Sequence, residues 1–141
     1  MLNHPGGSFA YRFDHGDHRV VFATDNEIDT ELDTDLDPDL PRQIPARFVD
    51  FARGADLLIA DAQYTDEEYP SKRGWGHSRV FTAVDFAIQA GCKQLALFHH
   101  DPMHSDAEVQ QIEASARARV AALGSDLVVF AAREGLELRY P

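Results

Sequence analysis

Apolar and polar residues alternate with a period of two near the start of the chain. Every second position of residues 8–14 is aromatic, which predicts a half-buried strand. The tight-turn sequence His15-Gly16-Asp17 follows, and residues 18–24 have the pattern of a return strand. We therefore expect residues 8–24 to form a β-hairpin, with Asp25 directly after it. The aromatic positions are Phe9, Tyr11 and Phe13.

Beyond this hairpin, helical periodicity alternates with short apolar runs. The predicted helices span residues 45–54, 78–90 and 106–123, and the predicted strands span residues 56–60, 94–98 and 126–131, with a last edge strand over 136–140. Ser105 and Glu108 have the spacing of a capping box at the start of the third helix. The order predicts an α/β fold in which a mixed sheet carries flanking helices, and we expect residues 1–141 to form a single domain.

An acidic stretch separates the hairpin from the first predicted helix. Aspartate or glutamate occupies every second position from 27 to 39, and Pro38 and Pro41 discourage regular structure there. The stretch has no glycine for the sharp turn of a calcium loop of the EF-hand type. We expect a solvated acidic loop, and the alternative is a loop that collects cations.

Charge and cysteine content narrow the range of functions. The net charge of −11 gives no footprint for binding phosphates along a nucleic acid, so a nucleic-acid partner is unlikely, although a local basic spot could hold one phosphate. The single cysteine, Cys92, excludes an internal disulfide framework and suits a reducing, cytoplasmic location. No apolar run is long enough to cross a membrane, and the first residues lack the pattern of a signal peptide.

Histidines and aspartates stand where predicted strands end and loops begin. His4 precedes the hairpin, Asp25 follows it, and His99 and His100 follow the strand over 94–98. Loops at strand ends are where α/β sheets build their sites, and imidazole with carboxylate suits zinc, manganese or iron. A fourth candidate is His77, which ends the long loop after the strand over 56–60. His15 and His18 flank the hairpin turn and are expected to face solvent, whereas His104 fits either a structural or a functional role.

Five short segments carry a resemblance to a known family. They are Asn3-His4-Pro5-Gly6-Gly7, Ala23-Thr24-Asp25, residues 55–64 (ADLLIADAQY), Gly74-Trp75-Gly76-His77-Ser78 and Leu97-Phe98-His99-His100-Asp101-Pro102. In this order they resemble the C-terminal half of a metallo-β-lactamase-fold hydrolase, in the branch of RNase Z-like and phosphodiesterase-like enzymes. The resemblance implies half of a four-layer αββα sandwich, with two metal ions bound between the sheets of a complete protein.

The same resemblance assigns roles to residues of this chain. His4 resembles the third-motif metal ligand, Asp25 the carboxylate that bridges two metals, and His99 the last-motif histidine, with His100 as its alternative. His77 resembles the catalytic histidine that contacts the scissile phosphate. The implied activity is hydrolysis of a phosphodiester or related ester through a metal-activated water. Asp61 occupies a place where the family has a polar partner that orients the ligating imidazoles.

One motif of the family, His-x-His-x-Asp-His, does not occur in this sequence. His4, Asp25 and His99 alone cannot complete the coordination of two ions. The chain is then expected to be a truncated product, one part of a split enzyme, or a non-catalytic half-fold that serves as an interaction module. Each alternative leaves an apolar sheet face uncovered, which predicts self-association into a dimer or pairing with a complementary N-terminal-half chain.

Overall fold

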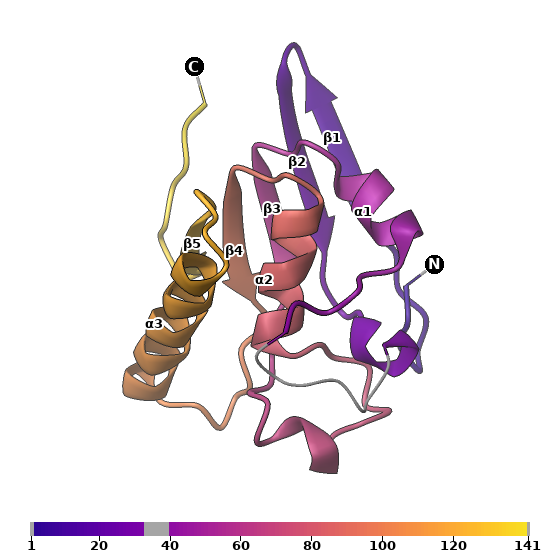
Figure 1. Cartoon of the computed structure of the whole chain (residues 1–141), viewed down its shortest axis with the longest axis vertical. Coiled ribbons are helices and arrows are strands. Elements are labelled where there is room, and N and C mark those ends of the chain that lie inside the picture. Colours follow the sequence, from indigo (N-terminus) through magenta and orange to yellow (C-terminus); the bar gives the residue numbers. More distant parts are fainter. Residues whose placement is uncertain (1, 33–39, 141) are drawn as a thin grey trace.

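A five-stranded sheet forms the centre of the computed structural model, which describes residues 2–32 and 40–140 (Figure 1). In order across the sheet, the strands are β1 (Tyr11–His15), β2 (His18–Ala23), β3 (Leu57–Asp61), β4 (Gln94–Phe98) and β5 (Val128–Ala131). β1 and β2 form the predicted antiparallel hairpin, and the other neighbours pair in parallel. The carboxyl ends of β2 to β5 therefore lie along one edge of the sheet. The predicted mixed sheet with flanking helices is confirmed.

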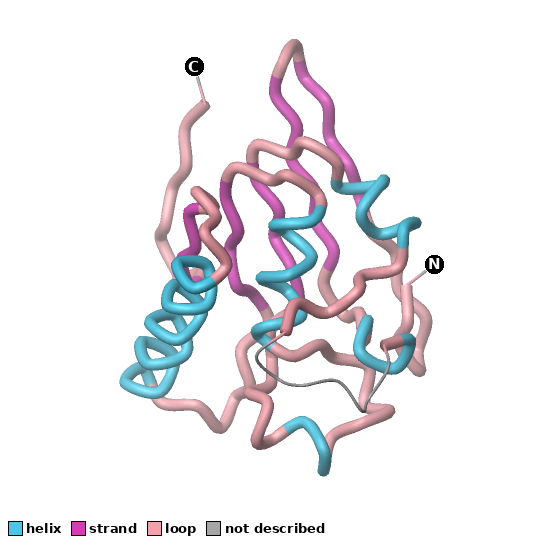
Figure 2. The backbone as a smooth tube through the Cα atoms, viewed as in Figure 1, coloured by secondary structure: helices cyan, strands magenta, loops and turns pink. Residues whose placement is uncertain are grey.

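The helices cover one face of this sheet (Figures 1 and 2). They are α1 (Ala46–Ala52), α2 (Val80–Gln89) and α3 (Asp106–Ala122), with short 3-10 turns η1 (Ile28–Glu31) and η2 (Tyr69–Ser71). Their buried residues join those of the strands in one core, which includes Val21, Leu58, Leu95, Val129, Phe48, Val84 and Ala116. None of the helices among the described residues has both the length and the apolar character needed to cross a membrane.

The start of α3 has the predicted capping box. Ser105 Oγ accepts a hydrogen bond from the Glu108 backbone N–H at 3.4 Å, and Glu108 Oε2 accepts one from the Ser105 N–H at 2.7 Å. Two amide donors that the first helical turn leaves without partners are thereby satisfied. The cap fixes where the chain leaves the loop that carries His99.

The opposite face of the sheet, called here the open face, has no helix on it. The strand register places on it Tyr11, Phe13, Val20, Phe22, Leu57, Ile59, Ala96, Phe98, Val128 and Phe130. The sequence predicts a half-buried first strand, but Tyr11 is 54% and Phe13 60% exposed, as is Phe9. That prediction is wrong because no layer formed by the described residues covers the aromatic side of β1.

The predicted edge strand over residues 136–140 is also wrong. The last backbone hydrogen bond to β4 runs from Ala132 N–H to Leu97 O at 2.9 Å. A turn follows, in which the Leu136 N–H donates to Arg133 O at 3.2 Å, and residues 136–140 form no ladder. The tail leaves the edge of β5 and brings the Tyr140 ring within 5.8 Å of the His18 ring.

The beginning of the acidic stretch is buried rather than solvated. Glu27 and Asp29 are almost completely buried, and residues 28–31 form η1. Asp29 accepts hydrogen bonds from the backbone and side chain of Arg79 and from the Thr82 hydroxyl. The predicted solvated loop is therefore wrong for this part, because these carboxylates have donors from distant segments. The remainder of the expected loop, residues 33–39, lies outside the described residues.

Candidate metal centre at the carboxyl edge of the sheet

Five polar side chains meet at the edge where the parallel strands end. Asp25 follows β2, Asp61 is the last residue of β3, and His99 follows β4. Because these strands are parallel neighbours, their carboxyl ends bring the three side chains to one place. His4 reaches them from the N-terminal loop and His77 from the loop before α2. We call His4, Asp25, Asp61, His77 and His99 the site cluster.

Asp25 lies between two imidazoles. Its Oδ1 is 3.3 Å from His99 Nε2 and 4.0 Å from His4 Nε2. The His77 ring stacks on the His99 ring with centroids 4.6 Å apart and meets the His4 ring edge-on at 5.4 Å. All three predicted metal-ligand residues, and the predicted catalytic histidine, are thus brought together. Their assignment as ligands and as catalyst stays a prediction.

The backbone is unusual at two members of the site cluster. Asp25 has a φ of 54° and His99 a φ of 60°, and they are the non-glycine residues with positive φ in the part of the chain that the structure describes. This left-handed conformation is uncommon for residues with a side chain and concentrates at functional sites. The Ser8 hydroxyl donates to the Asp25 carbonyl oxygen at 2.6 Å and helps hold this turn. The side chains of Asp25 and His99 approach each other to 3.3 Å across the edge.

Asp61 and His77 form a buried pair beside this opening. His77 Nδ1 is 2.7 Å from Asp61 Oδ2, and Asp61 Oδ1 accepts from the Ser78 N–H at 3.1 Å. Burial raises the pKa of Asp61, against the opposing effects of His77 and His99. Burial lowers the pKa of His77, but its hydrogen bond to Asp61 and the nearby carboxylates outweigh burial, so that the net shift is upward. With Nδ1 engaged by Asp61, the Nε2 atom of His77 is the nitrogen left for a ligand.

Glu27 holds the loop that carries His77, a role the sequence did not reveal. Its buried carboxylate accepts from the Tyr69 hydroxyl at 2.6 Å, from Gly74 N–H at 2.7 Å and from Gly76 N–H at 2.8 Å. A carboxylate without a cationic partner in the described residues is thus satisfied by three neutral donors. The sequence feature that could have indicated this role is the position of Glu27, two residues after Asp25 in the turn that ends β2.

Gly76 packs directly against His4. Its φ is +98°, and a Cβ at this position would lie 2.7 Å from Pro5 Cδ and overlap the His4 ring. A side chain here would therefore displace the imidazole, so that only glycine allows this approach. Together, Glu27 and Gly76 hold the loop over 74–77 against the N-terminal loop.

The donor set of the site cluster fits a divalent metal ion. Ligand atoms of His4, Asp25 and His77 all lie within 4.8 Å of one another, and so do those of Asp61, His77 and His99. His99 Nδ1 is buried without a hydrogen-bond partner among the described residues. The site cluster offers three imidazoles and two carboxylates, and two of these groups, His77 and Asp61, are hydrogen-bonded to each other. Such a set has the chemistry of a metal site together with residues that orient its ligands.

The other histidines lie outside these groups of donor atoms. His100, the alternative ligand, belongs to neither group, and burial lowers its pKa. The buried His104 side chain pairs with Glu68, with Nε2 2.7 Å from Oε1. His15 is exposed at the hairpin turn, and His18 starts β2 at the end of that strand remote from Asp25. His15 and His18 are therefore remote from the site cluster, as expected.

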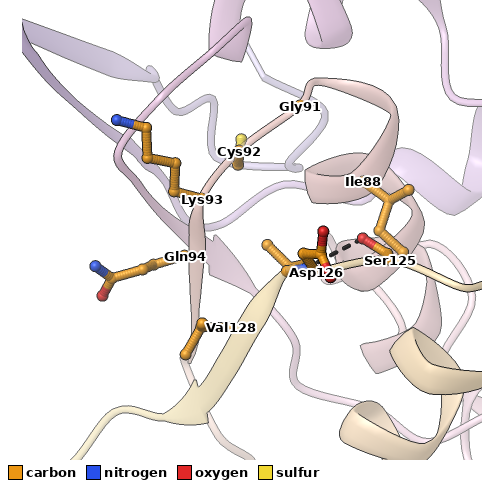
Figure 3. A pocket seen from close by; sticks show the side chains of 9 residues that line it. Ile88, Gly91, Cys92, Lys93, Gln94, Ser125, Asp126 and Val128 are labelled. Carbon is orange, nitrogen blue, oxygen red and sulfur yellow. Dashed lines mark hydrogen bonds between the residues drawn. The ribbon is translucent and has the colours of Figure 1, made fainter.

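A surface hollow lies elsewhere. It has a volume of about 450 Å³ and is lined by residues that include Gly91, Lys93, Gln94 and Asp126, before the amino ends of β4 and β5 (Figure 3). Lys93 Nζ is 2.7 Å from Asp56, so this cation already has a partner. The hollow holds no histidine and no pair of converging carboxylates. The site cluster lies at the opposite end of the sheet.

The chain is similar to known proteins over part of their length. No protein-family model matches the chain. Ribonuclease Z of Saccharolobus solfataricus is 43% identical over 58 residues, which are 41% of this chain and 19% of that protein. Ribonuclease Z of Sulfurisphaera tokodaii is 35% identical over 68 residues, 48% of this chain and 22% of that protein. The chain therefore matches only a small part of the length of these curated relatives.

A solved structure shows the fold. The metallo-β-lactamase fold protein YhfI from Bacillus subtilis superposes with a TM-score of 0.59 and 18% sequence identity, over 92% of this chain and 44% of that one. Because ribonucleases act on RNA, the likeness to ribonuclease Z does not support the expectation that a nucleic-acid partner is unlikely. The chain thus has the architecture of a metallo-β-lactamase fold over less than half of its structural neighbour, and part of its sequence is similar to ribonuclease Z.

Proposed function

We propose that the chain is part of a metal-dependent hydrolase that cleaves a phosphodiester or related ester. The observation that carries the proposal is the convergence of the site cluster at one sheet edge, with Asp25 Oδ1 3.3 Å from His99 Nε2. The likeness to ribonuclease Z supports a nuclease-type reaction over the other hydrolyses known for this fold. Residues 1–141 are proposed to fold as one domain in the cytoplasm, where the buried Cys92 stays reduced.

His4, Asp25 and His99 are the proposed metal ligands. Imidazole nitrogen and carboxylate oxygen favour zinc, with manganese or iron as alternatives. A bound divalent ion supplies Lewis acidity, which makes a coordinated water acidic enough to ionise near neutral pH. Two such ions in a complete site would share the Asp25 carboxylate, and His100 is not proposed as a ligand because it lies outside both donor groups.

His77 is the proposed catalytic residue. Asp61 holds its Nδ1 at 2.7 Å and so fixes the ring orientation, which leaves Nε2 directed at the substrate. A protonated imidazole stabilises the negative charge that develops on a phosphoryl oxygen, or donates a proton to the leaving group. The upward net shift of its pKa keeps His77 protonated to a higher pH than an isolated histidine.

The proposed ligands do not fill the coordination of two ions. We propose that the remaining ligands come from a segment or second chain that carries a His-x-His-x-Asp-His motif and packs on the open face. The exposed aromatic side chains of Tyr11 and Phe13 on that face suit such an apolar partner. Such an arrangement would place the additional histidines across the site cluster from Asp25.

A second candidate function follows from the same open face. The chain is then a non-catalytic interaction module that dimerises through this surface. Analytical ultracentrifugation at micromolar concentration tests self-association, and a well-folded monomer contradicts the dimer. The hydrolase proposal does not depend on that outcome, because a different chain can cover the face.

Metal analysis separates the two functions. The full chain is loaded with zinc or manganese, dialysed and analysed by mass spectrometry, alone and mixed with a polypeptide that bears the missing motif. Retention of metal, together with cleavage of bis(p-nitrophenyl) phosphate by the mixture, is the expected result. No retained metal and no cleavage in either sample would leave the interaction module as the function.

A further inference from the structure

The exposed Arg73 and Trp75, together with the half-buried Lys72, form a cationic and aromatic surface next to the site cluster. They belong to the loop between η2 and His77, which contains two cations and no acid from Pro70 to Gly76. Such a local excess of positive charge stands out in a chain with a net charge of −11. We call these three residues the loop platform.

The loop platform contacts the site through its own backbone. Gly76, next to Trp75, packs against the His4 ring. Lys72 Nζ lies 5.9 Å from the centroid of the Tyr64 ring, which in turn meets the His77 ring edge-on at 6.2 Å. A molecule held on the loop platform is thus held beside His4 and His77.

Trp75 offers a stacking surface. Its indole is 57% exposed, and Lys72 Nζ lies over one side of the ring at 4.3 Å from the centroid. A planar group can stack on the side that Lys72 leaves open, as bases do on aromatic side chains in proteins that bind single strands. A lone exposed apolar side chain is common on protein surfaces and would carry no inference without the neighbouring cations.

Neither Lys72 nor Arg73 is paired with an acid of the described residues. No ion pair joins Lys72 or Arg73 to a carboxylate of residues 2–32 or 40–140. Of the acids nearest in sequence, Asp66 pairs with Arg42 and Arg79, and Glu68 pairs with His104. Glu67 is exposed and joins no ion pair with the described residues. The ammonium and guanidinium groups are therefore available to an external anion such as a phosphate.

The loop is held in place before any ligand arrives. Glu27 accepts from the backbone N–H groups of Gly74 and Gly76, which flank Trp75 on both sides. The Lys72 N–H also donates to Tyr69 O at 2.8 Å, and the Trp75 N–H donates to Lys72 O at 3.1 Å. A fixed backbone reduces the entropy that a ligand loses when it binds.

We propose that the loop platform binds a nucleotide of a single strand, with the base stacked on Trp75 and a phosphate held by Lys72 and Arg73. This inference rests on the proposed function, for which it names the substrate class. In this proposal a short loop provides the positive charge that binds the phosphate, although the chain as a whole is acidic.

The chain contains a single tryptophan, so that its fluorescence reports on Trp75 alone. The full chain is titrated with AMP, ribose 5-phosphate and inorganic phosphate in the presence of EDTA, so that binding is separated from hydrolysis. Quenching by AMP but not by the two compounds without a base is the expected result. No quenching by AMP or by a single-stranded oligoadenylate would overturn the proposal.

Three variants assign the contacts. Lys72→Ala and Arg73→Ala should each weaken AMP binding about two- to fivefold, and Trp75→Ala should weaken oligoadenylate binding, measured by anisotropy, at least about fivefold. Arg139→Ala removes an exposed cation remote in sequence and should leave binding unchanged. Equal losses in Arg139→Ala and Lys72→Ala would mean non-specific charge attraction and would overturn the site.

A second measurement separates this inference from the proposed function. His99→Ala is expected to lose metal retention and keep AMP quenching, whereas Trp75→Ala is expected to keep metal retention. If the unaltered chain retains no metal, the hydrolase proposal is contradicted, and the quenching result is unaffected. Normal metal retention without quenching would contradict the loop platform alone.

Discussion

The chain buries charge in two clusters, and their partners differ. In the site cluster, the buried Asp61 is paired with His77, and His4, Asp25 and His99 remain partly open to solvent. In a second cluster, called here the arginine cluster, Asp29, Asp66 and Asp85 are paired with Arg42, Arg79 and Arg119. Asp85 accepts from Arg119 Nε and from the terminal Nη2 atom, both at 2.8 Å, and from the Arg42 N–H at 2.8 Å.

This difference suits the arginine cluster to a structural role and the site cluster to the binding of a metal or a substrate. A guanidinium is always charged and donates from a rigid fork, so it satisfies a buried carboxylate and offers no nitrogen lone pair to a metal. An imidazole bonded to a carboxylate through one nitrogen keeps its second nitrogen for a metal or a substrate. We therefore expect the arginine cluster to control stability and the site cluster to control metal binding.

The largest effect on stability is expected from Asp85→Ala. The change leaves the Arg119 guanidinium buried without its carboxylate partner, which typically costs about 3–5 kcal/mol. Urea unfolding followed by circular dichroism measures the loss. Asp50→Ala, which removes an exposed pair with Arg53, is the control and should cost at most about 1 kcal/mol. Equal costs for the two variants would contradict the structural role of the arginine cluster.

The next largest effect on stability is expected from Cys92, whose buried thiol is an acid without a charged partner among the described residues. Burial raises the pKa of the Cys92 thiol to about 11 from 9.0, so the folded state keeps its proton where the unfolded state loses it. Stability from this group is therefore complete below pH 9 and is lost as the pH rises to 11, by roughly 2–3 kcal/mol. Chemical denaturation over this pH range measures it, with Cys92→Ala as the reference. An unchanged pH slope in that variant would show that Cys92 is not responsible.

Glu27→Gln is expected to have an intermediate effect. The amide oxygen keeps one acceptor, but the charge that three donors share is lost, so a cost of about 1–3 kcal/mol is expected. Hydrogen exchange should also increase at Gly74 and Gly76, whose amides bond to Glu27. Glu67→Gln, a change at an exposed position of the same loop, is the control. Unchanged hydrogen exchange at Gly74 and Gly76 in Glu27→Gln would contradict the role of Glu27 in holding this loop.

The smallest effect on stability is expected from His99→Ala, despite its complete effect on metal retention. The ring is partly exposed and its Nδ1 has no partner among the described residues, so its removal should cost less than about 1 kcal/mol. Metal retention after dialysis, measured by mass spectrometry, should fall to background. His15→Ala should retain as much metal as the unaltered chain. Equal retention in both variants would remove His99 from the proposed ligands.

Local periodicity determined most of the fold. The strand over Gln94–Phe98 and the capped helix over Asp106–Ala122 lie within two residues of their predicted bounds, because apolar spacing and Ser105 act over a few neighbouring positions. Tyr11 and Phe13 were expected to be half-buried, but both are exposed. Alternation shows that the two sides of a strand differ, and it does not show whether another layer covers either side.

The sequence by itself determined the residue types of the proposed metal ligands and their places at strand ends, which parallel pairing then brings to one edge. Only the tertiary structure decided how the buried acids are used. Glu27 and Asp29 lie in a run of identical spacing, yet one binds backbone amides of Gly74 and Gly76 and the other binds Arg79. The reason is physical: a carboxylate becomes buried when donors from distant segments meet it, and no local pattern encodes where those donors arrive.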